Sequence, residues 1–167
     1  MNLYILRHGI AVEPGSPGFE DDADRPLTPE GERKLRRITE AMGALELGFD
    51  LILSSPYVRA RQTAEIVAEA LKARKRLASS DDLVPGGSAA KLIEHLGQLR
   101  PQPDDVLLVG HEPYLSELIS LLVSGTESSR VVLKKGGLCK LTTESLKHGR
   151  CATLLWLLTP KQMVLMA

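Results

Sequence analysis

The chain has 167 residues, yet it contains only two cysteines, six aromatic residues and no apolar run of 18 residues. Cys139 and Cys151 are too few for a disulfide framework, and their strand-like neighbours predict buried thiols in a reducing cytoplasm. So few aromatic side chains disfavour a base-stacking surface for nucleic acid. No segment is long enough to cross a membrane as a helix. Residues 1–7 lack the basic and apolar segments of a secretory leader. We therefore expect a cytoplasmic protein with neither a nucleic-acid nor a membrane partner.

The chain also lacks an excess of charge of either sign. It has 21 Lys and Arg residues against 21 Asp and Glu residues, so its formal net charge is zero. Any binding site for an anion must therefore be local. Hydrophobic residues make up 43% and charged residues 25%, which is ordinary for a globular protein. The length is typical of one domain, and we expect a single domain over 1–167. Nothing in the sequence suggests a large exposed apolar face, so we expect a monomer.

Apolar periodicity predicts an alternation of strands and helices. Helices are expected to begin near the Thr28–Pro29 and Ser55–Pro56 pairs, at Ser88 and near Leu115, because capping residues or apolar stripes mark these places. Residues 10–26, rich in Gly, Pro and Asp, are expected to form a long loop. Short apolar runs predict strands at 3–6, 50–54, 83–84, 106–109, 131–133, 138–142 and 152–158. This order predicts an α/β fold of three layers, α/β/α, with a mostly parallel central sheet and an antiparallel edge.

Basic and imidazole side chains follow three of these strands. His8 comes directly after the first strand, Arg59 lies shortly after the second, and His111 follows the strand that begins near Val106. Because sites in open α/β sheets form outside the carboxyl ends of parallel strands, we expect these three side chains to converge on one cleft. The cleft would be cationic although the chain as a whole is neutral.

Such a cleft suits a phosphoryl group, with a carboxylate as the lesser option. Guanidinium groups bind phosphate through paired hydrogen bonds and stay charged at any relevant pH, which suits Arg7 and Arg59. A neutral imidazole is a competent nucleophile toward phosphorus, and His8 is the candidate for that role. His111, protonated by an incoming dianion, would stabilise charge on the transferring group. Gly9 leaves space beside the nucleophile for the backbone to approach the ligand.

Four segments resemble motifs of the histidine phosphatase superfamily, also called phosphoglycerate mutase-like. They are Leu6–Gly9, Arg25–Gly31, Ser55–Ala64 and Gly110–Glu112, and they occur in the family's order and separation. The resemblance implies a phosphoglycerate mutase-like fold and a nucleophilic His8. It also implies a phosphate pocket of Arg7, Arg59 and His111, and no metal or other cofactor. The short chain and the segment Val84–Gly87 are most similar to the SixA-type phosphohistidine phosphatases.

One feature of the wider family is missing from its expected place. The mutases and sugar phosphatases carry a glutamate that protonates the leaving oxygen, whereas the comparable place here holds Val84 and Pro85. An alkoxide needs that proton more than an imidazole does, so the absence favours phosphohistidine over a phosphomonoester. If an acid exists, Asp81, Asp82 and the Asp21–Asp24 segment are the candidates.

The expected function is metal-independent removal of a phosphoryl group from a phosphohistidine-bearing protein, with phosphate as the product. The resemblance implies a histidine phosphotransfer domain or a phosphotransferase-type carrier as the partner. One alternative is a phosphatase of a small phosphomonoester metabolite on the same fold. Another is a phosphate-binding module without turnover. A metal site of His8, His111 and Glu112 is weakly supported because no further ligand cluster accompanies them.

Overall fold

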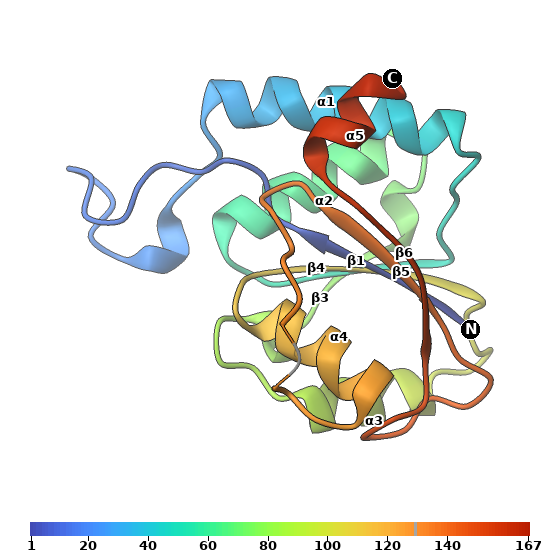
Figure 1. Ribbon diagram of the computed structural model, residues 1–167. Helices are drawn as coiled ribbons and strands as arrows, with labels where there is room; N and C mark the ends of the chain where they lie inside the picture. Colours follow the sequence, from blue (N-terminus) through green and yellow to red (C-terminus); the bar gives the residue numbers. More distant parts are fainter. Residues whose placement is uncertain (129) are drawn as a thin grey trace.

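A computed structural model describes residues 1–128 and 130–167. In this part of the chain, six strands form one sheet in the order β3-β2-β4-β1-β5-β6 (Figure 1). Three neighbouring pairs of strands are parallel: β1 with β4, β4 with β2, and β2 with β3. β5 is antiparallel to both of its neighbours, β1 and β6. The strands are β1 (Asn2–Arg7), β2 (Leu51–Ser54), β3 (Leu77–Ser79), β4 (Asp105–Gly110), β5 (Leu138–Thr142) and β6 (Thr153–Leu158). The predicted mostly parallel sheet with an antiparallel edge is confirmed.

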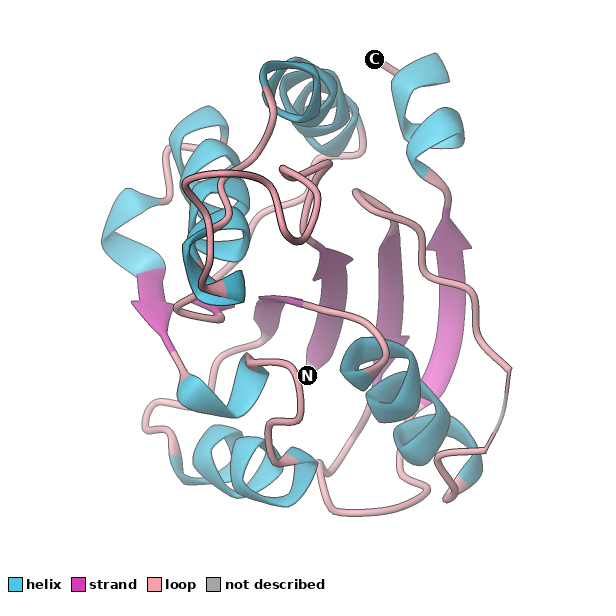
Figure 2. Ribbon diagram, turned by 90° about the vertical axis from the view of Figure 1, so that its left-hand side faces the viewer, coloured by secondary structure: helices cyan, strands magenta, loops and turns pink. Residues whose placement is uncertain are grey.

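Helices cover both faces of the sheet, as Figures 1 and 2 show. Helices α1, α2 and α5 lie on one face, and α3 and α4 lie on the other. The molecule therefore has the three layers of the phosphoglycerate mutase-like α/β fold. The helices are α1 (Pro29–Ala44), α2 (Val58–Ala70), α3 (Ala89–Gln98), α4 (Tyr114–Ser124) and α5 (Pro160–Leu165), with 3-10 turns η1 (Asp22–Asp24), η2 (Arg74–Arg76) and η3 (Asp81–Leu83).

The alternation of side chains along β1 divides the core between the two faces. Leu3 and Ile5 pack with α3 and α4, whereas Tyr4 and Leu6 pack with α1 and α2. All four side chains are buried, because successive strand residues point to opposite faces and both faces are covered. Burial on both faces explains why the strands of the parallel part read as continuous apolar runs.

Several sequence predictions about local structure are wrong. The strand expected at 83–84 is replaced by η3, and β3 lies earlier in the chain at Leu77–Ser79. The segment 131–133 is irregular, because β5 already occupies the place beside β1. Cys139 is a buried free thiol as expected, but Cys151 is only half-buried.

Side-chain capping marks the start of three of the five α-helices that the structure describes, whereas α2 and α4 begin without a side-chain cap. Thr28 and Ser88 cap α1 and α3 by accepting backbone N–H bonds, as predicted. The prediction that Ser55 caps α2 is wrong, because α2 begins at Val58 without a side-chain cap. The short α5 was not predicted, although Thr159 caps it and forms a capping box with Gln162. Among the helices of the described residues, none is long and apolar enough to cross a membrane.

Candidate active site

The carboxyl ends of three parallel strands lie side by side and carry the predicted site residues. Arg7 at the end of β1 lies opposite Gly110 at the end of β4. The next residues continue this alignment, because the His8 N–H donates to the Gly110 carbonyl at 3.1 Å. The imidazole rings of His8 and His111 are consequently 5.1 Å apart between centroids. Together with Arg59 from the first turn of α2, they form what we call the histidine–arginine cluster.

The ring of His8 is fixed by its own backbone neighbour. Its Nδ1 lies 2.7 Å from the Gly9 carbonyl oxygen, which can only accept, so Nδ1 carries the proton. The lone pair is then on Nε2, and the Arg59 Nε–H group donates to it at 3.3 Å. Burial lowers the pKa of His8 to about 3, the Gly9 hydrogen bond partly opposes this, and the charges of His111 and Arg59 add to the lowering. His8 is therefore neutral at neutral pH, with its lone pair toward the site.

His111 has a different set of neighbours. Its Nε2 lies 2.8 Å from the hydroxyl of Ser55, and the Tyr57 ring packs edge-on at 5.1 Å between centroids. Its Nδ1 is buried and, among the residues that the structure covers, has no hydrogen-bond partner. Burial, followed by the charge of Arg59, lowers the pKa of His111 to about 3. An added anion would counteract that charge and favour a protonated His111.

Arg59 is buried and already holds an anionic group, the side chain of Asp22. Its Nη2 donates to the Asp22 carboxylate at 2.8 Å, and its Nη1 donates to the Asp22 carbonyl at 2.5 Å. Arg25 binds the other carboxylate oxygen through Nε at 2.8 Å and Nη2 at 2.6 Å. Partial desolvation would raise the pKa of Asp22, but the hydrogen bonds from Arg25 and Arg59 outweigh it and lower that pKa. The carboxylate therefore stands where two guanidinium groups would receive phosphate oxygens.

The Asp22 contact also limits access to the nucleophile. His8 is 6% exposed and Arg59 is 3% exposed. Asp22 belongs to the 13–24 segment, called the acidic loop below, which projects from the body of the molecule after β1 (Figure 1). The Asp22 carboxylate therefore occupies the Nη2 group of Arg59 on the side of the acidic loop.

Arg7 borders the same site from the end of β1. One of its Nη atoms donates to the Leu133 carbonyl at 3.0 Å. Its Nε is buried and lacks a hydrogen-bond partner in the described part of the chain. The carboxyl group of Glu112 interacts with the charge of Arg7. Burial raises the pKa of Glu112. A 2.6 Å hydrogen bond from the Ser116 hydroxyl and the charge of Arg7 oppose that increase. The unpartnered Nε of Arg7 leaves a donor available beside the histidine–arginine cluster.

Gly9 also has a packing role, because it lies against α1. A Cβ at Gly9 would lie 2.6 Å from the Leu35 side chain in the core, so packing against α1 demands glycine here. Its N–H donates to the Thr63 hydroxyl at 3.1 Å, and that hydroxyl donates to the Arg59 carbonyl at 2.7 Å. Neither Ser55 nor Thr63 is among the predicted site residues, yet Ser55 contacts His111, and Thr63 links the strand of His8 to the helix of Arg59.

The candidate acids differ in their contacts and in their exposure to solvent. Asp22 enters the site, whereas Asp21 accepts a hydrogen bond from the Ala23 N–H, and Asp24 is exposed. Asp82 lies in η3 and affects the charge environment of Tyr114. Across residues 1–128 and 130–167, no group of three or more His, Cys, Asp or Glu side chains is arranged to hold a metal ion.

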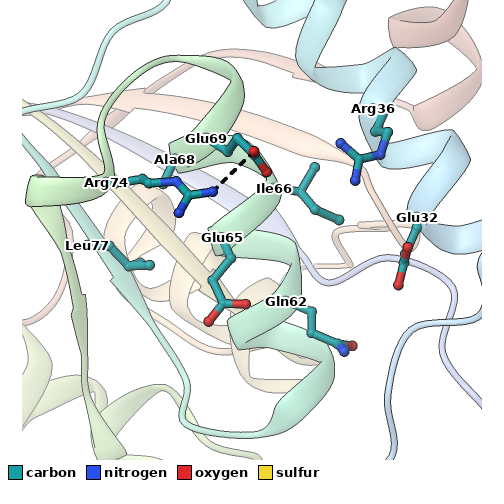
Figure 3. A pocket seen from close by; sticks show the side chains of 9 residues that line it. All are labelled: Glu32, Arg36, Gln62, Glu65, Ile66, Ala68, Glu69, Arg74 and Leu77. Carbon is teal, nitrogen blue, oxygen red and sulfur yellow. Dashed lines mark ion pairs between the residues drawn. The ribbon is translucent and has the colours of Figure 1, made fainter.

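A separate hollow of about 490 Å³ lies on α1, α2 and the start of β3 (Figure 3). Its polar lining combines both signs of charge, with an ion pair of 3.1 Å between Arg74 and Glu69. The charged residues that line it are Glu32, Arg36, Glu65, Glu69 and Arg74. Neither histidine of the cluster lines this hollow, and its acids outnumber its bases.

Comparisons with known proteins identify the family of the chain. The model of the histidine phosphatase superfamily (branch 1) matches residues 3–83. An uncharacterised protein of Picosynechococcus is 37% identical over 142 residues, which are 84% of each chain. The phosphohistidine phosphatase SixA homologue of Haemophilus influenzae is 30% identical over 130 residues, which are 73% of this chain and 77% of the relative. The solved structure of the protein histidine phosphatase SixA complexed with tungstate has a TM-score of 0.83 and 25% identity. It covers 96% of this chain and 98% of its own.

Fold and site together define an α/β protein whose parallel strand ends present two neutral imidazoles and a buried guanidinium to an oxyanion. The chain belongs to the histidine phosphatase superfamily, and its relatives there include SixA proteins. The chain is therefore a phosphatase, an enzyme of the hydrolase class.

Proposed function

We propose that the chain removes the phosphoryl group from phosphohistidine in a protein, through a covalent intermediate on His8 and without a metal ion. The observation that carries this proposal is the state of the His8 ring. Its Nδ1 proton is held by the Gly9 carbonyl, and its Nε2 lone pair lies beside the Arg59 guanidinium. A neutral, oriented imidazole next to a phosphate-binding cation is what nucleophilic attack on phosphorus requires.

In the first step, the His8 Nε2 lone pair forms a bond to phosphorus. The bond between phosphorus and the substrate imidazole nitrogen breaks, and its electron pair stays on that nitrogen. In the second step, water attacks the phosphorus of phospho-His8, the new P–N bond breaks, and phosphate leaves with the water oxygen. His8 returns to its starting state, so one water is consumed for each phosphate released.

The surrounding residues act on the charge of the transferring group. Arg59 and the free Nε donor of Arg7 bind its oxygens, and a protonated His111 adds a further donor. Burial, followed by the charge of Arg59, lowers the pKa of His111 to about 3. A bound dianion reverses that charge effect and raises the pKa, so that His111 can donate to the transition state.

The leaving group decides between substrates. An imidazole has a reference pKa near ~6.5, so it departs with little help from an acid, whereas an alkoxide does not. The name phosphohistidine phosphatase of the Haemophilus relative, and the tungstate bound to the similar SixA structure, support an oxyanion site that serves phosphohistidine.

A second candidate, a phosphatase of small phosphomonoesters, is favoured by the position of Asp22. This is the one candidate acid among the described residues that is hydrogen-bonded to Arg59. In the structure, Asp22 is ionised and has no proton to give. When a phosphoryl group takes its place on the guanidinium, the hydrogen bonds that lower its pKa are lost. The carboxyl group could then bind a proton for an alkoxide leaving group.

Turnover in the presence of EDTA tests the proposal. The substrates are a histidine phosphotransfer domain phosphorylated on histidine by phosphoramidate, free phosphohistidine, and a panel of phosphomonoesters. We expect kcat/KM for phosphohistidine to exceed that of every ester by about a hundredfold or more. A higher value for an ester would establish the second candidate. Tight vanadate binding without turnover of any substrate would indicate a phosphate-binding module.

A further inference from the structure

A groove of about 530 Å³ lies between α1 and α5. Its apolar lining comes from Val164 and Leu165, and Leu165 is 76% exposed. Its cationic lining includes Arg33 and Lys34 of α1 and Lys161 of α5. Below it is called the α1–α5 groove.

The groove is connected to the candidate active site through the turn at Gly136. The Gly136 N–H group donates to the carbonyl oxygens of Arg7 and His8, at 3.0 and 3.2 Å. On its other side, a Cβ at Gly136 would lie 2.9 Å from Ile38 of α1 and 3.7 Å from Pro160, the first residue of α5. One turn of chain therefore touches both the nucleophile's backbone and the two helices of the groove.

Topology places the groove at the rim of the site. β6 runs parallel to β1, because both are antiparallel to β5, so α5 begins at the edge where β1 ends. Helix α1 begins at the same edge, since the Thr28 N–H donates to the Ile10 carbonyl at 2.9 Å, two residues after His8. A protein whose side chain enters the site would therefore approach the edge of the sheet at which both helices of the groove begin.

The cations of the groove are not used within the protein. Arg33, Lys34 and Lys161 form no ion pair or side-chain hydrogen bond with any residue in the described parts of the chain. Arg37, beside them, is already used: it donates to the Val164 carbonyl at 3.1 Å and pairs with Glu40 at 3.5 Å. The hollow in Figure 3 differs, since its acids outnumber its bases and Arg74 is paired with Glu69. One carboxylate, Glu30, also lines the groove, so the three unpaired cations still leave a local excess of positive charge in a chain of zero net charge.

We propose that the α1–α5 groove docks an acidic surface of the phosphohistidine-bearing protein. The proposal rests on the function proposed above and adds the partner's chemistry to it. Carboxylates of the partner face Arg33, Lys34 and Lys161, and an apolar side chain of the partner covers Leu165. Lys134, two residues before Gly136, is also exposed. Complementary charge of this kind raises the rate of encounter and sets the orientation of the bound partner.

The test compares a protein substrate with a small one. The variant R33E/K34E/K161E reverses the groove charge, and K75E/K91E/K147E reverses three cations on other surfaces as a matched control. For the phosphorylated histidine phosphotransfer domain, we expect kcat/KM of the groove variant to fall about tenfold or more at low salt. For free phosphohistidine, we expect it to stay within about twofold of the unmodified protein. The control should change neither value beyond that margin.

Further measurements keep the outcomes separate. If the groove variant fails to fold, raising NaCl from about 50 to about 300 mM in the unmodified protein should lower kcat/KM for the protein substrate only. Leu165→Ser should lower it about threefold, through loss of apolar contact. Equal losses on both substrates, or no loss, would overturn the docking role. So would sedimentation showing that the groove joins two copies of this chain. If the unmodified protein hydrolyses phosphohistidine in neither form, the proposed function itself fails, and the docking proposal fails with it.

Discussion

The two halves of the candidate active site are built in different ways. The histidine–arginine cluster lies at strand ends and in the first turn of α2, and its members are between 2% and 6% exposed. The acidic loop on the other side is largely exposed, and a single carboxylate, Asp22, reaches inward. The sheet therefore fixes the groups that we propose act on phosphorus, while the loop contributes a carboxylate that the substrate displaces in this proposal. The predictions below test this difference in order of decreasing effect.

Replacing His8 should have the largest effect. His8→Ala removes the proposed nucleophile, and the other groups cannot replace it, so kcat for phosphohistidine should fall by about ten-thousandfold or more. The fold should survive, because the ring is held by one backbone carbonyl and one guanidinium. Steady-state turnover and circular dichroism measure both points. Retention of even a tenth of the activity would assign the nucleophile to another group.

The junction between the acidic loop and α1 should be the next most sensitive place. A Cβ at Gly31 would lie 2.1 Å from the Ile10 carbonyl oxygen, which is backbone and cannot move freely. Gly31→Ala should therefore lower the free energy of unfolding by about 3 kcal/mol. Gly43→Ala is the matched control in the same helix, where a Cβ meets nothing within 4 Å. It should raise stability by about 0.5 kcal/mol, as measured by urea unfolding.

Acid should destabilise the histidine–arginine cluster through its two neutral imidazoles. Their folded pKa values are about 3, whereas an unfolded histidine has a pKa near 6.5. Between these values the unfolded state binds more protons, so stability falls as the pH drops from 6.5 toward 3. Each histidine contributes a slope of up to about 1.4 kcal/mol per pH unit.

His111→Gln should remove roughly half of that contribution, so this variant should lose less stability on acidification than the unmodified chain. Urea unfolding at a series of pH values provides the measurement. If the free energy of unfolding of both proteins changed with pH in the same way, the pKa of His111 would not be lowered in the folded state.

The smallest effect is expected on the loop side. Asp22→Asn removes the negative charge that competes for Arg59, so vanadate should bind about three- to tenfold more tightly. Asp24→Asn is the control, because this exposed carboxylate forms no ion pair in the described chain. Isothermal titration measures both variants. Weaker vanadate binding by Asp22→Asn would show that Asp22 orders the site instead of competing for it.

The sequence was sufficient to predict the strand-end half of the site. His8, Arg59 and His111 each follow an apolar run, and parallel strands bring their carboxyl ends together whatever the loops do. The choice of Asp22 among the clustered acids could not be predicted, because it depends on how far the loop reaches over Arg59. Ser55 was misassigned for a related reason: a Ser–Pro pair is typical of a helix start, but its hydroxyl contacts His111 instead. The α1–α5 groove was not predicted because the six-residue α5 is too short to show periodicity.

The measurement that tests the central claim most directly is trapping of the intermediate on the sheet side of the site. The protein is mixed with a histidine phosphotransfer domain carrying ³²P-phosphohistidine, quenched with alkali within milliseconds, and digested for peptide mapping. We expect label on this chain, at His8, that is stable to alkali and labile to acid, as a phosphoramidate is. Rapid release of labelled phosphate with no label on His8 at any time would contradict it, because phosphorus would then pass directly to water.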